Sequence, residues 1–183
     1  MSLYFITSNP YKKEEALEIF KGRGITLEIV DIPIQEIMHL DLKVIVKDKI
    51  LKAYKEFGLP CVVEHGAIKI EALNGLPGGI SKVVWDNIGN KLCKLILSGE
   101  ARNAEAESVV GYCDGKQIYL FSGITKGTIA HEARGKRMFQ WDPIFIPKGS
   151  TKTYSELGFP EKERYSQATK AWKKFIKFLE KKG

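Results

Sequence analysis

The amino-acid sequence predicts an α/β fold, and two observations carry this prediction. Short apolar runs typical of buried strands alternate along the chain with longer segments that have helix caps at their starts or glycines at their ends. Near the middle, two further runs flank an Asp-Gly pair, a strong short-range signal of an antiparallel hairpin. Strands interleaved with helices, together with one hairpin, are consistent with a sheet flanked by helices.

Six runs are expected to form strands, and most are bounded by polar or turn-forming residues. In chain order they are residues 3–6, 27–30, 61–63, 108–113, 117–125 and 141–146. The runs at 3–6 and 61–63 are continuously apolar and should be buried, whereas 27–30 alternates between apolar and polar side chains. The fourth and fifth runs flank Asp114 and Gly115, which predict the hairpin turn.

Five segments are expected to form helices, most of them marked by recognisable caps or stop signals. In chain order they are residues 10–21, 42–57, 87–97, a short helix from 153, and a last helix that begins near 160. Asn9 is a good N-cap with Pro10 at the first helical position, and Asp41 can cap the second helix. Glu156 stands three residues after Thr153, which is the spacing of a capping box.

Composition favours one domain, or two interlocked lobes, over residues 1–183 of a cytoplasmic protein. With 183 residues and 44% hydrophobic content, the chain can bury a sizeable core. No apolar run approaches the ~18 residues of a membrane span, and the N-terminus lacks the pattern of a signal peptide. Cys61, Cys93 and Cys113 are odd in number and widely spaced, so they indicate reduced, mostly buried thiols.

A polar turn between the first strand and the first helix is a candidate anion site. Its sequence, TSNPYKK over residues 7–13, ends a buried strand and starts a helix. A helix N-terminus offers free N–H groups and the positive end of the helix dipole, and Lys12 adds a positive charge. The alternative is a plain capped helix without a ligand.

A second candidate segment follows the strand at 61–63. Glu64 and His65 stand at the C-terminal end of that strand, where open α/β sheets usually bind ligands. Residues 72–79 contain three glycines and a proline, which predict a tight loop.

The aromatic run at 139–145 and the basic stretch at 162–166 complete the pattern. Aromatic faces such as Phe139 and Trp141 can sandwich a flat heterocycle, and the carboxylate of Asp142 can accept hydrogen bonds from its edge. The alternative for the aromatic run is an ordinary core strand. The polar stretch from Lys162 to Ser166 is expected to open the last helix.

These separated motifs, taken in order, resemble the inosine/xanthosine triphosphate pyrophosphatases, the house-cleaning enzymes that remove deaminated purine nucleotides. The match runs from the turn at 7–12 through Glu36, Glu64, the loop at 72–78 and the aromatic run to residues 162–166, and so covers essentially the whole chain. The resemblance implies a mixed sheet with flanking helices, two lobes around a central nucleotide-binding cleft, and a homodimer.

The resemblance also implies the reaction, in which water attacks the α-phosphorus with the help of Mg²⁺ and releases a nucleoside monophosphate and pyrophosphate. Glu36 and Glu64 would hold the metal, since Mg²⁺ prefers oxygen ligands, and would form the catalytic site together with Lys12 and His65. The residues implied to bind the nucleoside triphosphate are Thr7, Asn9, Lys12, Lys82, Phe139, Trp141, Asp142, Lys162, Ser166 and Gln167.

Three positions depart from the family pattern. His65 replaces a second acid, and it could act as a general base, as a ligand for a softer metal such as Mn²⁺, or leave the site slow or dead. Gln167 and Ala168 replace a His-Arg pair that reads the 6-oxo group of the purine, so discrimination between bases should change. Gln140 stands where a glycine is usual, and its side chain could crowd the base pocket or reach the base.

Two alternative functions follow from these departures and from the charge. The first is a nucleotide-binding relative with altered base specificity or little turnover. The second is a nucleic-acid-binding module that uses the basic last helix, because residues 161–183 hold eight Lys/Arg against three Glu in a chain of net charge +7. That second alternative ranks last, because the basic run lacks a groove-reading motif. The stripe of Ala168, Trp172, Phe175 and Leu179 on the same helix is expected to pack on the core.

Overall fold

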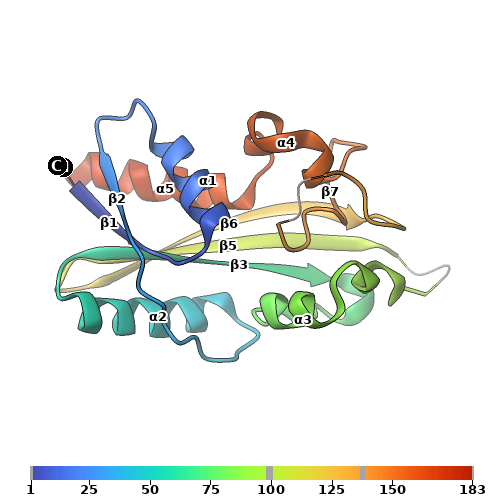
Figure 1. Ribbon diagram of the computed structural model, residues 1–183, viewed down its shortest axis with the longest axis horizontal. Coiled ribbons are helices and arrows are strands. Elements are labelled where there is room, and N and C mark those ends of the chain that lie inside the picture. Colours follow the sequence, from blue (N-terminus) through green and yellow to red (C-terminus); the bar gives the residue numbers. More distant parts are fainter. Residues whose placement is uncertain (1, 98–100, 137–138, 183) are drawn as a thin grey trace.

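The computed structural model describes residues 2–97, 101–136 and 139–182, and its centre is a mixed sheet flanked by helices (Figure 1). The strands are β1 (Ser2–Ile6), β2 (Thr26–Val30), β3 (Cys61–Ile70), β4 (Pro77–Gly78), β5 (Asn103–Cys113), β6 (Ile118–Ile129) and β7 (Phe145–Pro147). The helices are α1 (Pro10–Phe20), α2 (Leu42–Phe57), α3 (Ser81–Ile88), α4 (Tyr154–Glu163) and α5 (Gln167–Lys182), with 3-10 helices η1 (Glu71–Leu73) and η2 (Gly89–Lys94). The predicted α/β class is confirmed.

The sheet combines a parallel and an antiparallel part. Its strand order is β2-β1-β3-β5-β6-β7, and β4 pairs with β3 off this path. β1 runs parallel to both β2 and β3, whereas β3, β5, β6 and β7 pair antiparallel. β5 and β6 form the predicted hairpin, in which Asp114 N–H donates to Gln117 O at 3.2 Å and Gly115 has a φ of 91°.

Helices cover both faces of the sheet, α1 and α5 on one face and α2 and α3 on the other (Figure 1). Successive strand residues point to opposite faces, so Phe5 packs against the α5 side and Ile6 against the α2 side. The rings of Phe5 and Trp172 meet edge to face with centroids 5.1 Å apart. The whole predicted stripe of α5 is buried in this cluster, as expected: Ala168, Trp172, Phe175 and Leu179.

The predicted helix caps are present. Asn9 Oδ1 accepts hydrogen bonds from the N–H of Tyr11 at 3.0 Å and of Lys12 at 3.3 Å. Thr153 and Glu156 form a complete capping box at the start of α4. Such caps satisfy N–H groups that have no partner inside the helix, and each contributes about 1 kcal/mol.

Three strands extend well beyond their predicted bounds. The run expected at 61–63 continues to Ile70, the run expected at 108–113 begins at Asn103, and the run expected at 117–125 continues to Ile129. β3 and β5 pair along the whole length of β3, from Cys61 with Cys113 to Ile70 with Ala104. Polar side chains interrupt the apolar pattern of both segments, which is why hydrophobicity alone ended them early.

Three other predicted boundaries are wrong. The helix expected at 87–97 is instead α3 followed by η2, because Gly89 adopts a φ of 51° and breaks the α-helix. The strand expected at 141–146 starts only at Phe145, because residues 141–144 form a turn in which Ile144 N–H donates to Trp141 O at 2.9 Å. The loop expected at 72–79 does turn tightly, but it includes part of η1 and all of β4.

The last helix does not begin near 160. Residues 154–163 belong to α4, which contains a non-helical Gly158, and α5 begins at Gln167. Lys162 therefore lies near the end of α4. Ser166 stands just before α5 and accepts a hydrogen bond from the N–H of Thr169 at 3.3 Å, as an N-cap does.

No helix in the described part of the chain is both long and apolar enough to cross a membrane. The three cysteines are free and buried, as the sequence predicted.

Gly123 of β6 allows α5 to rest directly on the sheet. A Cβ atom at this position would lie 2.0 Å from the carbonyl oxygen of Gln167 and 2.6 Å from the backbone nitrogen of Ala171. Gly123→Ala should therefore displace the start of α5 and lower the free energy of unfolding by about 1–3 kcal/mol or more, as measured by urea unfolding.

Gly66→Ala is the matched control, because a Cβ atom there would meet its nearest neighbour at an ordinary 3.5 Å. This variant should be as stable as the wild type or slightly more stable, because alanine restricts the unfolded chain. Equal effects of the two substitutions would contradict the close approach of α5 to β6.

Candidate active site

The candidate site lies where β3 runs past the end of β1. β1 pairs with β3 through Tyr4–Cys61 and Phe5–Val62, and then ends at Ile6. The next part of β3, with Glu64 and His65, therefore faces a cavity of about 270 Å³ in place of a neighbouring strand. This is the carboxyl end of parallel strands, the edge at which open α/β sheets bind ligands.

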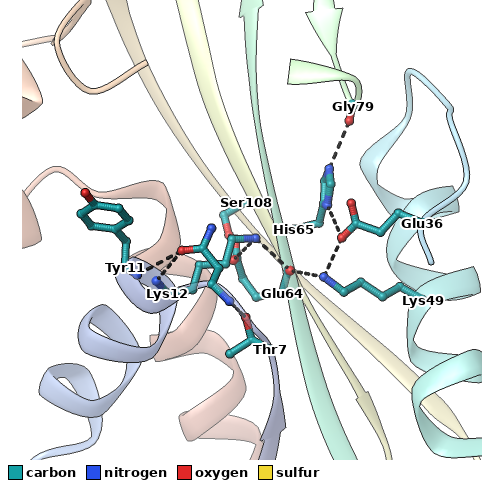
Figure 2. A network of polar contacts seen from close by, with 10 residues as sticks. Thr7, Tyr11, Lys12, Glu36, Lys49, Glu64, His65, Gly79 and Ser108 are labelled. Atoms are coloured by element: carbon teal, nitrogen blue, oxygen red, sulfur yellow. Dashed lines mark hydrogen bonds and ion pairs between the residues drawn. The ribbon is translucent and has the colours of Figure 1, made fainter. Parts of the chain in front are cut away.

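Glu64 is held on one face of β3 by charged and polar groups (Figure 2). Lys12 Nζ lies 2.8 Å from Glu64 Oε2 and also donates to the Glu64 carbonyl oxygen at 3.1 Å, while the hydroxyl of Ser108 donates to Oε1. Burial alone would raise the pKa of Glu64, but the charge and hydrogen bond of Lys12 outweigh it, so the pKa is lowered. Glu64 is therefore an ionised carboxylate inside the protein.

His65 points to the opposite face and joins a second charged group (Figure 2). Its Nδ1 lies 3.3 Å from Glu36 Oε1, and the same oxygen lies 2.7 Å from Lys49 Nζ. Burial would raise the pKa of Glu36, but the hydrogen bond from His65 and the charge of Lys49 outweigh it and lower the pKa. Burial, and then the charge of Lys12, lower the pKa of Lys49.

Both ring nitrogens of His65 face hydrogen-bond acceptors. Nδ1 faces the carboxylate of Glu36, and Nε2 lies 3.1 Å from the carbonyl oxygen of Gly79. In this arrangement the His65 side chain bridges the loop before α2 to the segment just before α3.

The far end of the cavity has aromatic walls. The ring centroids of Phe139 and Tyr11 lie 5.2 Å apart, and those of Phe139 and Trp141 lie 6.4 Å apart. Trp141 Nε1 is buried and finds no hydrogen-bond acceptor among the described residues. Gln140, between the two aromatics, lines the cavity with a left-handed φ of 42°, which explains why glycine suits this position.

A buried ion pair supports this aromatic end. Lys162 Nζ lies 2.8 Å from Asp142 Oδ2 and sits over the rings of Phe139 and Tyr154, 5.5 Å and 5.1 Å from their centroids. These contacts hold the Lys162 ammonium beside the ring of Phe139.

Glu15 adds a third carboxyl group to the cavity wall. Burial raises its pKa most, and the charge of Lys162 opposes this only in part. Its Oε1 accepts a hydrogen bond from the Ser166 hydroxyl at 3.2 Å. Glu15 thus connects α1 to the residue that caps α5.

The structure brings most of the predicted site residues to this one cavity. Those that line it are Thr7, Asn9, Lys12, Glu36, Glu64, His65, Lys82, Phe139, Trp141, Lys162 and Gln167. Asp142 and Ser166 lie behind the wall, where they hold Lys162 and Glu15. Thr7 and Asn9 shape the turn itself, since Thr7 Oγ1 accepts a hydrogen bond from Asn9 N–H at 3.2 Å.

Three residues of the site were not predicted from the sequence: Glu15, Lys49 and Ser108. Lys49 carried a usable signal, because it falls on the apolar stripe of α2, where a charged side chain must find a buried partner. Glu15 stands three residues after Lys12 on α1 and so shares its face. Ser108 reaches Glu64 across the strand pair β3–β5, which depends on a register that the sequence does not reveal.

Comparison of the sequence with models of known protein families identifies the family of this chain. A family model described as the Ham1 family matches residues 3–178. The chain belongs to the Ham1 family. This membership confirms the resemblance that the separated motifs indicated.

Relatives and solved structures of Ham1 proteins agree with this. The chain is 41% identical over 180 residues to the dITP/XTP pyrophosphatase of Methanopyrus kandleri, covering 97% of this chain and 96% of that one. It is 39% identical over 181 residues to the dITP/XTP pyrophosphatase of Pyrococcus horikoshii, covering 98% and 97%. The Ham1 protein of Staphylococcus aureus superposes with a TM-score of 0.82 at 23% identity over 100% of both chains, which shows the shared fold.

Glu36→Gln should make this Ham1 protein less stable in a pH-dependent way. The substitution removes the anion facing Lys49 and His65, so the free energy of unfolding should fall by about 1–3 kcal/mol at pH 7. The folded pKa of Glu36 is below its ordinary value of 4.5, so its charge stabilises the fold above that pH. This contribution is lost as the pH falls from 4.5 toward the folded pKa.

Urea unfolding at pH 7 and at about pH 3 tests the direction of this pH dependence. The difference in free energy of unfolding between wild type and variant should be smaller at the lower pH. Asp31→Asn is the control, since Asp31 pairs with Lys13 at 2.7 Å on the surface and should contribute less than about 1 kcal/mol. A Glu36→Gln effect that is the same at both pH values would contradict the assignment.

Proposed function

We propose that this protein is a nucleoside triphosphate pyrophosphatase that hydrolyses dITP- and XTP-like nucleotides to the monophosphate and pyrophosphate. The observation that carries the proposal is a single cavity with two ionised carboxylates, Glu36 and Glu64, between buried lysines and an aromatic wall. The names of the relatives from Methanopyrus kandleri and Pyrococcus horikoshii, dITP/XTP pyrophosphatase, support the same activity.

The triphosphate belongs at the end of the cavity where α1 begins. The capped turn at Asn9 directs the N-terminus of α1 and the ammonium of Lys12 toward the cavity. Lys49 lies deeper and Lys82 lies at the rim, paired with Asp86. Attack on phosphorus increases the negative charge on its oxygens, and fixed cations in a partly dry site stabilise that charge.

Both carboxylates line the same cavity, and carboxylate oxygens are the protein ligands that a hard divalent metal ion prefers. The described residues contain no cluster of three or more metal-binding side chains, so protein ligands alone would not surround the ion. Mg²⁺ tolerates this, because it keeps several waters and takes phosphate oxygens from its substrate. Glu36 and Glu64 would hold Mg²⁺, which when bound supplies charge stabilisation and lowers the pKa of a bound water.

His65 acts in this proposal as a positioning residue. Both ring nitrogens are engaged, one by Glu36 and one by the Gly79 carbonyl, so neither is directed at a metal or at water. It orients Glu36 instead, as the hydrogen-bond partners of metal ligands do. This role favours the hard metal Mg²⁺ over Mn²⁺, because the protein ligands are carboxylate oxygens.

The base would stack against Phe139 at the aromatic end, with Trp141 beside it. Lys162, held by Asp142, and Gln167 close the same end. The homodimer and the cytoplasmic location that the sequence predicts stay predictions.

Hydrolysis of a nucleotide panel with Mg²⁺ tests the proposed reaction. Phosphate should appear from ITP, dITP and XTP only when inorganic pyrophosphatase is added, because cleavage at the α-phosphorus releases pyrophosphate. Glu64→Gln should lower kcat by about 10²-fold or more, since it removes a charged ligand.

Glu107→Gln is the matched control, because Glu107 is also a mostly buried carboxylate that pairs with a lysine, Lys69 at 2.6 Å, but it does not line the cavity. Its rate should equal that of the wild type. Phosphate without the coupling enzyme would refute the α-phosphorus reaction, and no phosphate from any nucleotide would favour a binding protein with little turnover.

His65→Asp tests the positioning role through stability. The substitution places a carboxylate beside Glu36 in place of an imidazole, so the melting temperature in EDTA should fall below that of the wild type. Added Mg²⁺ should then raise it by more than it raises the wild type, because the metal neutralises the added charge. A melting temperature in EDTA equal to that of the wild type would contradict the positioning role of His65.

A further inference from the structure

One side of β6 is an open sheet edge over most of its length. β5 pairs with the inner side of β6 from Ile118 to Thr128, whereas β7 pairs with the outer side only at residues 127–129. In the described part of the chain, no strand lies against the outer side of residues 118–126. An open edge presents backbone N–H and C=O groups that can pair with another extended chain.

The sequence of this edge is suited to pairing with another extended chain. Residues 118–125 read IYLFSGIT and contain neither a charged residue nor a proline. Segments of this kind, rich in β-branched and aromatic residues, form intermolecular strand pairs when they lie on an exposed edge. Ile124 is 47% exposed, so part of the apolar surface of this segment is open to solvent.

The even-numbered residues of β6 direct their backbone groups to this open side. Ile129 N–H donates to the Arg102 carbonyl oxygen at 2.8 Å, and the register of β6 with β5 continues from there without interruption. Odd-numbered residues of β6 therefore bond to β5 and even-numbered residues face away from it, because the backbone groups of a strand alternate between its two sides. Ser122 and Ile124 thus have carbonyl oxygens that point outward.

Two lysines of α5 reach over this edge and occupy both carbonyl oxygens. Lys174 Nζ donates to the carbonyl oxygen of Ser122 at 2.6 Å, and Lys170 Nζ donates to that of Ile124 at 3.0 Å. Four residues of a helix and two residues of a strand both span about 6–7 Å, so the two lysines match the two carbonyls. An added strand would need the acceptors that these ammonium groups now fill.

Contacts of this kind account for much of the basic side of α5. Lys182 lies 2.5 Å from Asp114 in the turn before β6. Lys173 lies 3.6 Å from Glu163 of α4. A nucleic-acid-binding face would direct its lysines toward solvent and phosphates. The basic side of α5 is therefore better explained by contacts within the protein, two of which cover the edge of β6.

We propose that the outer edge of β6 is a pairing surface for a second copy of this chain, and that Lys170 and Lys174 keep this surface closed. Two copies would meet about a two-fold axis with their β6 strands antiparallel, because the same edge can then serve both partners. This pairing would remove the lysines from their carbonyls and bring together two ammonium groups from each copy, whose repulsion disfavours it. The residues that line the cavity include neither lysine, so this surface is independent of the proposed function.

A variant that carries both Lys170→Met and Lys174→Met tests the proposal by opening the edge. Methionine keeps a long, unbranched side chain but has neither a charge nor an N–H group to donate. Sedimentation velocity over a series of protein concentrations should show species of at least twice the mass of the wild-type protein. A mass equal to that of the wild type at every concentration would overturn the proposal.

A variant that carries both Lys177→Met and Lys181→Met is the matched control, because it removes the same charge from the same helix. Both side chains are exposed, and neither forms a hydrogen bond or ion pair within the described part of the chain. This control should keep the wild-type mass. Association as strong as that of the test variant would attribute the effect to net charge and overturn the proposal.

Replacing Lys170 and Lys174 together by arginine should also leave the mass unchanged. Arginine keeps both the charge and the N–H donors, so the carbonyl oxygens of β6 stay covered. Association of this variant to the same extent as the methionine variant would contradict the role assigned to the two ammonium groups.

Hydrogen–deuterium exchange, read by mass spectrometry, locates the new contact. Pairing of two β6 edges would engage the outward N–H groups of the even-numbered residues and slow their exchange. In the methionine variant, the peptide that contains residues 118–126 should therefore exchange more slowly at the concentration that favours association than after dilution. Slower exchange of another segment, with β6 unchanged, would overturn the assignment of the surface to this edge.

Should the double methionine variant fail to fold, Lys174→Met decides the question by itself. Lys174 is exposed, and its replacement uncovers one carbonyl oxygen, that of Ser122. This protein should associate at a lower concentration than Lys177→Met, which removes one charge from the same helix. Equal masses of these two single variants at every concentration would overturn the proposal.

Discussion

β1 ends at Ile6 while β3 continues to Ile70, and the site depends on this difference in strand length. A longer β1 would cover Glu64 and His65 with another strand and engage their backbone groups. Because β1 ends early, the carbonyl oxygen of Glu64 is free to accept hydrogen bonds from Lys12 at 3.1 Å and from Lys49 at 3.3 Å. Lys12 of α1 and Lys49 of α2 therefore approach the same carbonyl oxygen from opposite faces of the sheet.

The early end of β1 also allows the buried charged side chains around β3 to pair with one another. Two carboxylates are paired with two lysines, and His65 lies beside one of them, so the buried charges compensate one another. In the proposed function, a nucleotide with a metal ion would bring both signs of charge and would replace these partners, with phosphates binding the lysines and the metal binding the carboxylates. The same residues would then stabilise the free protein and bind the ligand, which is why Glu36 should matter for both stability and activity.

Local signals in the sequence predicted local structure well. The caps at Asn9 and at Thr153 depend on neighbouring residues, so they could be recognised directly. The length of β3 could not, because its stability comes from pairing with β5, a segment far away in the chain. For the same reason the sequence named Glu64 but missed Ser108, and named Gln167 without the hydroxyl of Tyr154 that hydrogen-bonds to it.

The placement of Glu64 and His65 on opposite faces of β3 also has a consequence for folding fidelity. If β3 paired with β5 one residue out of register, every side chain of β3 would turn to the other face. Glu64 would then approach the carboxylate of Glu36, and Lys12 would lose its carboxylate partner. Attraction between Lys12 and Glu64 would be replaced by repulsion between two carboxylates, in an environment that water screens poorly. The charged side chains of the site therefore disfavour misaligned pairing of β3 with β5. Correct pairing of the central strands and correct assembly of the site depend on each other.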